Sequence, residues 1–167
     1  MGNVNIGVNP TQVWAATAVP EYRLGHVVGV DSSSGKKEFV FGRAKGAVTA
    51  AGYACTEETG FDFAMASVTT TTAGTAGFGT RVAVAQAALA DNEYGWFQIY
   101  GKGSIRTLAS TAKGTRLNTT GTAGAVDDDA TSGSEQINGL VLGTATGGAE
   151  ATNADAILSY PSVGTTL

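Results

Sequence analysis

The sequence predicts an all-β protein, a compact β-barrel or β-sandwich of short antiparallel strands with an extended N-terminal arm. Three observations lead to this prediction. The apolar runs are short and rich in Val, Thr, Phe and Tyr, and clusters of Gly, Ser and Asp separate them at a spacing typical of all-β folds. Apolar residues almost never recur with a helical period. At 167 residues, the chain has the length of one domain.

Small side chains dominate the composition. Gly, Ala and Thr make up 74 of the 167 residues, whereas Leu, Ile, Val and Phe together supply 34. So few large apolar side chains build a thin core. Disorder usually combines low hydrophobicity with a high net charge, but only 14% of these residues are charged and the formal net charge is -4. We therefore expect a folded protein with a modest core.

Residues 1–25 are expected to form an arm, and residues 26–167 the β domain. Apolar residues at positions 4, 6 and 8 alternate with polar ones, and a proline interrupts the chain on either side of residues 13–15. Such a segment suits either a strand added to a neighbouring subunit or an edge strand on its own domain. The predicted interaction residues of the arm are Val4, Ile6, Val8, Trp14, Tyr22 and Arg23.

Two hairpins are expected in the β domain. The first joins strands at residues 26–30 and 38–41 through a loop slightly longer than the tightest hairpins. The second joins a strand at residues 94–100 to one at residues 104–108. Its turn would be Gly101-Lys102-Gly103, because glycine supplies the positive φ angles that a tight reversal needs.

The strand at residues 94–100 is apolar on both faces. Alternation places Trp96 with Tyr94 and Tyr100 on one face, and Phe97 with Ile99 on the other. A strand of this kind is buried on both sides, so one face should meet a sister repeat and the other the N-terminal segment or another subunit. Tyr94, Trp96 and Tyr100 complete the predicted interaction surface.

Two segments, residues 69–77 and 119–134, are expected to be loops without a strand of their own. The first loop precedes residues 81–86, in which polar or large side chains alternate with small ones as in a strand. The Ala and Leu residues at positions 83–90 favour a helix by propensity, but the alternation predicts a strand here. Matching pieces of sequence on the two sides of these loops predict a weak tandem repeat, residues 46–102 and 103–162. Two units that share one core would bury more apolar surface than one unit alone.

The inventory of reactive side chains argues against an enzyme. One His and one Cys exclude a multi-His metal site, a Cys pair and an internal disulfide. His26 lacks a second His and a GxSxG nucleophile, so a structural or surface role is favoured over a small hydrolase. Cys55 reads as a small buried apolar residue. Glu57 and Glu58 would suit a glycosidase only in a cleft lined with aromatic residues.

Charge is uneven along the chain. All ten Lys and Arg residues lie at or before Arg116, and residues 117–167 hold six acids. The one basic concentration is expected to be solvated hairpin ends rather than a nucleic-acid site; it consists of Lys36, Lys37, Arg43 and Lys45. The acidic run at residues 127–129, with Glu135, departs from the EF-hand spacing and reads as a solvated loop.

Several further ligand classes are not expected. Gly101-Lys102-Gly103-Ser104 does not match a phosphate loop, because no helix follows it. No apolar run approaches the length of a membrane span, and the first residues lack the features of a signal peptide. The sequence thus predicts no cofactor, no metal, no nucleic acid and no membrane, and a protein made in a reducing cytoplasm.

Over about residues 20–105 the chain resembles small structural proteins of tailed bacteriophages, and in particular capsid decoration, or cement, proteins. The stretches that carry the resemblance are Tyr22-Arg23-Leu24-Gly25-His26-Val27, Glu38-Phe39-Val40-Phe41, residues 47–52, residues 81–86 and Tyr94-Gly95-Trp96-Phe97-Gln98-Ile99-Tyr100-Gly101. These motifs are structural, and the resemblance brings no catalytic residue with it.

The resemblance implies a β-rich homotrimer on the exterior of the phage head, made in the cytoplasm of a bacterial host. Its partner would be the major capsid protein, whose neighbouring subunits it would clamp together. An alternative from another class is a tail- or surface-associated carbohydrate-binding module. In that case Trp14, Tyr94, Trp96 and Tyr100 would be the platforms on which sugars stack.

Overall fold

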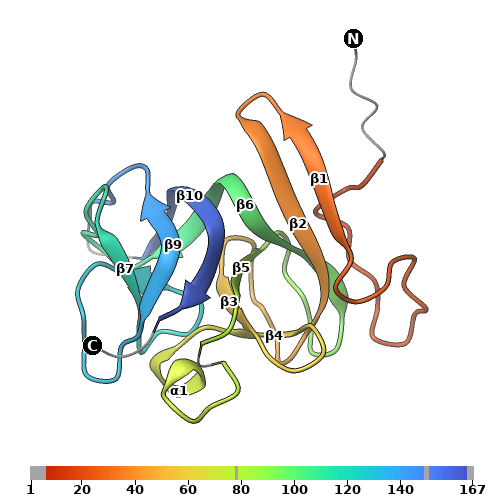
Figure 1. Ribbon diagram of the computed structural model, residues 1–167, viewed down its shortest axis with the longest axis horizontal. Helices are drawn as coiled ribbons and strands as arrows, with labels where there is room; N and C mark the ends of the chain where they lie inside the picture. Colours follow the sequence, from red (N-terminus) through yellow and green to blue (C-terminus); the bar gives the residue numbers. More distant parts are fainter. Residues whose placement is uncertain (1–6, 78, 149–150, 165–167) are drawn as a thin grey trace.

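A computed structural model describes residues 7–77, 79–148 and 151–164. Strands dominate these residues, with one single-turn helix (Figure 1), so the all-β prediction is confirmed. In chain order the elements are β1 (Val27–Ser32), β2 (Gly35–Ala44), β3 (Ala54–Glu57), β4 (Asp62–Met65), α1 (Val68–Thr71), β5 (Val82–Ala85), β6 (Tyr94–Thr107), β7 (Arg116–Thr119), β8 (Val126–Asp127), β9 (Gln136–Leu142) and β10 (Thr152–Val163).

The strands form one mixed sheet in the order β1-β2-β4-β3-β5-β6-β10-β9-β7-β8. Most strand pairs are antiparallel, as predicted, whereas β2 pairs with β4, and β6 with β8, in parallel. Additional pairings of β2 with β6 and of β6 with β8 close two circuits of strands. The first circuit consists of the strands β2, β4, β3, β5 and β6, and the second consists of β6, β10, β9, β7 and β8. They share β6, and although neither is a true barrel, the arrangement is sandwich-like.

The predicted turn at residues 101–103 is wrong, because β6 runs unbroken for 14 residues. Gly101 has a φ of 92°, and this positive angle occurs at an irregularity within the strand instead of at a turn. Opposite it on β2, Glu38 pairs with Tyr100 while Phe39 pairs with Gln98, which is a shift of register. The boundary of the expected tandem repeat, between residues 102 and 103, therefore lies inside a single strand.

The first hairpin is tighter than expected. β1 and β2 stay paired until Ser32 lies opposite Gly35, which leaves a turn of two residues. The Ser32 hydroxyl donates to the Gly35 carbonyl at 2.7 Å and accepts from the Ser34 N–H at 3.3 Å. These local bonds stabilise the short turn. The hairpin projects from the body of the molecule (Figure 1).

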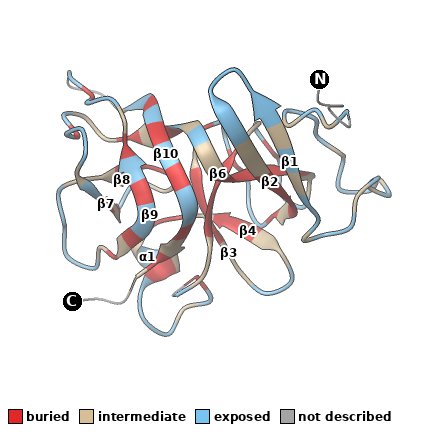
Figure 2. Cartoon of the chain, turned by 45° about the horizontal axis from the view of Figure 1, so that its top comes forward, coloured by how far each residue is buried: buried red, intermediate tan, exposed pale blue. Residues whose placement is uncertain are grey.

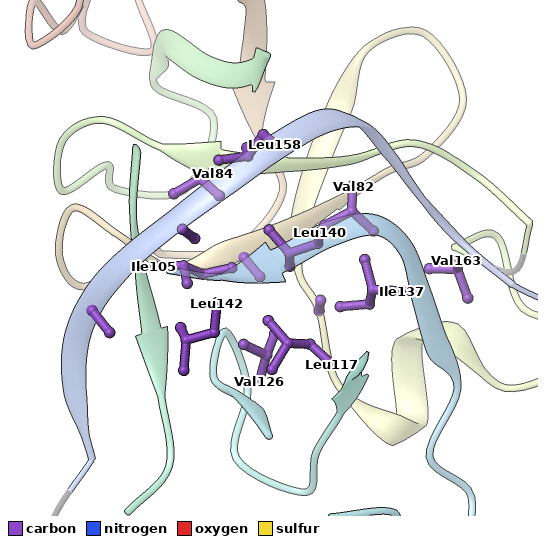
Figure 3. Packing of buried hydrophobic residues seen from close by; sticks show 14 residues of the cluster. Val82, Val84, Ile105, Leu117, Val126, Ile137, Leu140, Leu142, Leu158 and Val163 are labelled. Carbon is purple, nitrogen blue, oxygen red and sulfur yellow. The ribbon is translucent and has the colours of Figure 1, made fainter. Parts of the chain in front are cut away.

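Each circuit of strands surrounds its own group of buried side chains. The core of the second circuit consists of aliphatic residues, among them Ile105, Leu117, Ile137 and Leu158, and Val82 and Val84 of the neighbouring strand β5 pack against it (Figure 3). Buried and exposed residues alternate along β10 (Figure 2), as they must when one face of a strand is solvated. Four alanines, Ala54, Ala66, Ala154 and Ala156, belong to the same cluster.

The first circuit packs around aromatic rings. Phe63 and Phe97 stack with centroids 4.2 Å apart and an interplanar angle of 17°. Cys55 lies in the same cluster with no exposed surface, and burial raises the pKa of its thiol. The expectation that Cys55 is a small buried apolar residue is confirmed.

The Thr-rich segment at residues 69–77, expected as a loop, contains most of α1. Ser67 caps this turn: its hydroxyl accepts from the Thr70 N–H at 3.3 Å, and the Thr70 hydroxyl accepts from the Ser67 N–H at 2.9 Å. Thr71 is buried and its hydroxyl lies 3.1 Å from that of Thr119. A single turn has no period to detect, so the helix was missing from the prediction. The second expected loop, residues 119–134, likewise contains the two residues of β8.

Candidate interaction surfaces

A third cluster of side chains joins the N-terminal segment to the outer face of β2 and β6. Phe39, Phe41 and Trp96 are buried at its centre. The partly buried residues packed around them are Val8, Trp14, Tyr22, Val28, Val30 and Tyr94. This group, called here the aromatic layer, holds the described part of the arm on its own domain.

Rings in the aromatic layer meet mainly edge to face. Trp14 lies 5.1 Å from Phe41, and Tyr22 lies 5.0 Å from Trp96, between ring centroids. The backbone of Trp14 also bridges to Tyr94, with N–H to carbonyl distances of 3.0 and 2.9 Å in the two directions. Of the two interpretations of the arm, the described residues fit the one in which it pairs with its own domain.

The two-sided burial predicted for the aromatic strand is confirmed. Trp96 faces the aromatic layer, and Phe97 and Ile99 face the core of the first circuit. Trp96 is 1% exposed, so it offers no stacking surface to a ligand. Trp14 and Tyr94 are half-buried in the same layer.

The other predicted interaction residues are dispersed. Val8 and Tyr22 are half-buried in the aromatic layer, and Arg23 is exposed in the N-terminal segment. Val4 and Ile6 lie outside the described residues. The predicted set is therefore largely an internal packing layer rather than an open surface.

His26 is exposed and stacks on Tyr22, with centroids 5.6 Å apart and planes at 16°. Its ring also meets that of Trp96 edge to face at 6.3 Å. These contacts give His26 a structural role on the surface of the aromatic layer, as its sequence context predicts.

Tyr100 is the one predicted aromatic residue outside the aromatic layer; it is half-buried and lies 5.2 Å from the ring of Tyr160. The Tyr160 hydroxyl donates to Glu38 at 2.7 Å, and Lys36 forms an ion pair with the same carboxylate at 2.6 Å. Hydrogen bonds from Lys36 and then Tyr160 lower the pKa of Glu38. The bond to Glu38 raises the pKa of Tyr160.

Tyr160 was not among the predicted residues. It lies 122 positions from Glu38, and its φ of 49° is unusual for a bulky side chain. No local sequence pattern predicts the contact with Glu38 or the positive φ of Tyr160. Only the shift of register between Leu158 and Ser162, where β10 pairs with β9, places this ring beside Tyr100.

The basic cluster is mostly neutralised by nearby carboxylates. Arg43 donates to both oxygens of Asp62, at 2.8 and 2.7 Å, and this bond raises the pKa of Arg43. Lys45 pairs with Glu58, as Lys36 does with Glu38. Three of the four cations of the cluster, Lys36, Arg43 and Lys45, therefore each have a carboxylate beside them.

The carboxylates at residues 57 and 58 line a shallow depression with Thr80 and Arg81. Glu57 pairs with Arg81 at 3.4 Å, and burial raises the pKa of Glu57 while Arg81 opposes that shift. No aromatic residue is among the described residues that line the depression.

Carboxylates of the acidic loop bind nearby chain instead of converging on one point. Asp127 accepts from the Thr111 hydroxyl at 3.0 Å and from the Asp128 N–H at 2.9 Å. Asp128 accepts from the Ala112 N–H at 3.0 Å, and burial raises the pKa of Asp127. Among the residues that the structure describes, no group of three metal-binding side chains could hold an ion.

Large apolar side chains reach the surface in two separate places, neither of which was predicted. One group belongs to the N-terminal segment and β1, and the other to β9 and β10. The first group comprises Val13, Val19, Leu24 and Val27, and the second Val141, Ile157 and Tyr160. Such exposed apolar groups are common where proteins meet partners.

Comparison with models of known protein families and with curated proteins found no match. Across residues 7–77, 79–148 and 151–164, no helix is long and apolar enough to cross a membrane.

Proposed function

We propose that the protein is a non-enzymatic structural component of a bacteriophage virion, a homotrimeric decoration protein on the outside of the head. It would bind the major capsid protein and stabilise contacts between neighbouring shell subunits. The observation that carries the proposal is the use of polar and aromatic side chains to hold the fold. The ion pair Arg43–Asp62 joins β2 to β4, and the hydrogen bond from Tyr160 to Glu38 joins β10 to β2. The aromatic layer holds the N-terminal segment on the domain.

The fold suits such a task physically. Clamping a shell needs area, shape and symmetry rather than a group with a tuned pKa. A chain rich in Gly, Ala and Thr lets strands approach closely and leaves much of its surface free for contacts. The resemblance of residues 20–105 to phage decoration proteins points to the same role.

The carbohydrate-binding alternative has less support. A sugar-binding platform needs an exposed ring, and Trp96 is 1% exposed. Tyr160 is 53% exposed, and its ring lies beside the half-buried ring of Tyr100. A glycan array with the Tyr160→Ala variant as control tests this alternative, and a decoration protein should give no signal in either form.

Three measurements test the proposal. Light scattering on the purified chain should give the mass of a trimer. Shells assembled from the major capsid protein of the same phage should bind it in a sedimentation assay, and electron cryomicroscopy should reveal added density outside the shell. A monomer that leaves no density on the shell exterior would show the proposal to be wrong.

A further inference from the structure

A row of four exposed side chains crosses the outer face of the second circuit. Lys102 on β6 lies opposite Ile157 on β10, Ile157 opposite Val141 on β9, and Val141 opposite Arg116 on β7. Residues that lie directly opposite on neighbouring strands share a face of the sheet. With about 4.8 Å between strands, this outer row spans roughly 14 Å.

The centre of the outer row is apolar and uncovered. Ile157 is 56% and Val141 43% exposed, whereas their chain neighbours Leu158 and Leu140 are buried at 1% and 2%. A shallow hollow of about 300 Å³ lies beside Ile157, lined also by Gly143 and Thr144. A cross-strand pair of large aliphatic side chains in contact with water gains free energy when a partner covers it.

The two ends of the outer row differ in their charge balance. Lys102 is paired with Asp155 at 3.0 Å. Arg116 is exposed, and within the described ranges no ion pair is recorded for it. A partner that fits the row would therefore place an apolar side chain over Ile157 and a carboxylate near Arg116.

A loop of the N-terminal segment, residues 16–21, has this combination. Val19 at its tip is 94% exposed, the highest value among the exposed large apolar residues named above. Glu21, two residues later, is exposed and has no recorded ion pair among the described residues. Two extended residues span about 7 Å, so Val19 could reach Ile157 while Glu21 reaches the long side chain of Arg116.

One molecule cannot make this contact with itself, because the N-terminal segment and the strands β7 and β9 lie at opposite ends of the molecule (Figure 1). We infer that the Val19 loop of one copy docks on the outer row of the next copy. The inference rests on the proposed function, of which the homotrimer is a part. Two different patches that complement each other make a head-to-tail contact, which closes into a ring of three when successive copies are related by a third of a turn. Three copies in a ring cover every Val19 loop and every outer row.

Paired substitutions test the contact. Val19→Asp and Ile157→Asp should each turn trimers into monomers in light scattering, with unchanged circular dichroism. The matched controls Thr17→Asp and Thr152→Asp add the same charge at exposed positions of the same loop and strand, and they should remain trimers. An equal mixture of Val19→Asp and Ile157→Asp should yield dimers, because each variant keeps one intact face.

A charge exchange tests the polar part of the contact. Glu21→Arg and Arg116→Glu should each raise the trimer dissociation constant at least tenfold, and the double variant should restore it to within about threefold. Trimers that persist in both Asp variants, or a monomeric wild type, would overturn the inference.

Shell binding by the same proteins separates the two proposals. A wild type that forms trimers by another face and still decorates shells overturns this contact and leaves the proposed function standing. If the trimer depends on Val19 and Ile157 but does not bind shells, the result supports the contact and contradicts the proposed function. Asp variants that stay trimeric but lose shell binding would mean that the outer row faces the shell, which also overturns the inference.

Discussion

At the scale of single residues, Gly101 decides how β6 passes β2. Its φ of 92° is unfavourable for any other residue, and a Cβ there would lie 2.3 Å from the Lys36 carbonyl oxygen. Because that oxygen belongs to the backbone, the clash can be relieved only by moving β2. Both penalties arise at the same residue.

We therefore expect Gly101→Ala to lower the free energy of unfolding by more than about 2 kcal/mol, measured by urea denaturation. Gly114→Ala is the matched control, because Gly114 has a φ of 75° but open space around its Cβ position. Its cost should stay near 1 kcal/mol, the strain of the backbone angle alone. Equal costs at the two positions would contradict the role of the close contact.

Tyr160 and Glu38 make stability depend on pH. The pKa of Glu38 is lowered in the folded chain, so its contribution is present above the ordinary value of about 4.3 and lost as pH falls through the lowered pKa. The pKa of Tyr160 is raised, so its contribution is present below about 10 and lost as pH rises through the raised pKa. The hydrogen bond from Tyr160 to Glu38 should therefore stabilise the folded state most between about pH 5 and pH 9.

The variant Tyr160→Phe should lower the melting temperature within this pH window and converge on the wild type below it. Tyr100→Phe provides the control, because no hydrogen bond is recorded for that hydroxyl among the described residues. Its melting temperature should follow the wild type at every pH. A Tyr160→Phe effect that persists below about pH 3 would show that Glu38 is not the cause.

At the scale of elements, the N-terminal segment acts as a cover for β2 and β6. Trp14 packs on Phe41 and bridges to Tyr94 through its backbone, so the segment shields rings that would otherwise meet water. Deleting residues 1–19 would remove Val8 and Trp14 from the aromatic layer. We expect that deletion to destabilise the domain as well as to remove any contact that the arm makes with a neighbour.

Trp14→Ala should cost about 2–4 kcal/mol of unfolding free energy, because the truncated ring is large and half-buried. Trp96 is then the remaining tryptophan of the chain, and its emission should move to longer wavelength as water enters the layer. Val13→Ala, at an exposed neighbour, should change stability by less than 0.5 kcal/mol. An unshifted Trp96 spectrum in Trp14→Ala would contradict the covering role.

Periodicity predicted the strands but not their continuity. The two-faced strand around Trp96 and Phe97 was predictable because alternation is a local property of the sequence. The continuation of β6 through Gly101 was not, since a glycine with positive φ fits a turn and a bulge equally well. The pairing of Tyr160 with Glu38 was also beyond local patterns, because it depends on register across three strands.

The interaction surface was the least predictable part. Aromatic side chains at alternating positions indicate burial against something, and the sequence does not say whether the cover is the same chain or a partner. In this molecule Trp14 and Tyr22 are the cover for Trp96. The exposed residues Val141 and Ile157 lie on different strands, so only the register that aligns β9 with β10 places the two side chains in one row.

At the scale of the whole molecule, β6 couples the two circuits. Its first half pairs with β2 and β5, and its second half with β10 and β8. A chain whose two cores share an unbroken strand should unfold as one cooperative unit.

Phe97→Ala in the first core and Leu117→Ala in the second should each cost about 2–5 kcal/mol. In native-state hydrogen exchange, the slowest-exchanging amides of both circuits should then lose the same free energy of protection, whichever of the two variants is measured. Exposed Val27→Ala, which belongs to neither core, is the control and should change protection little. If Phe97→Ala leaves the amides of β7 and β9 unchanged, the circuits unfold independently.

The burial of Cys55 bears on how the protein can be studied and used. The chain has one cysteine, and in the folded state no part of that residue is exposed to solvent. A cysteine placed at Ser33, on the tip of the projecting β1–β2 hairpin (Figure 1), would be the one thiol that a maleimide reagent reaches. Dyes, gold particles or peptides could then be attached at a single defined point without first removing the natural cysteine.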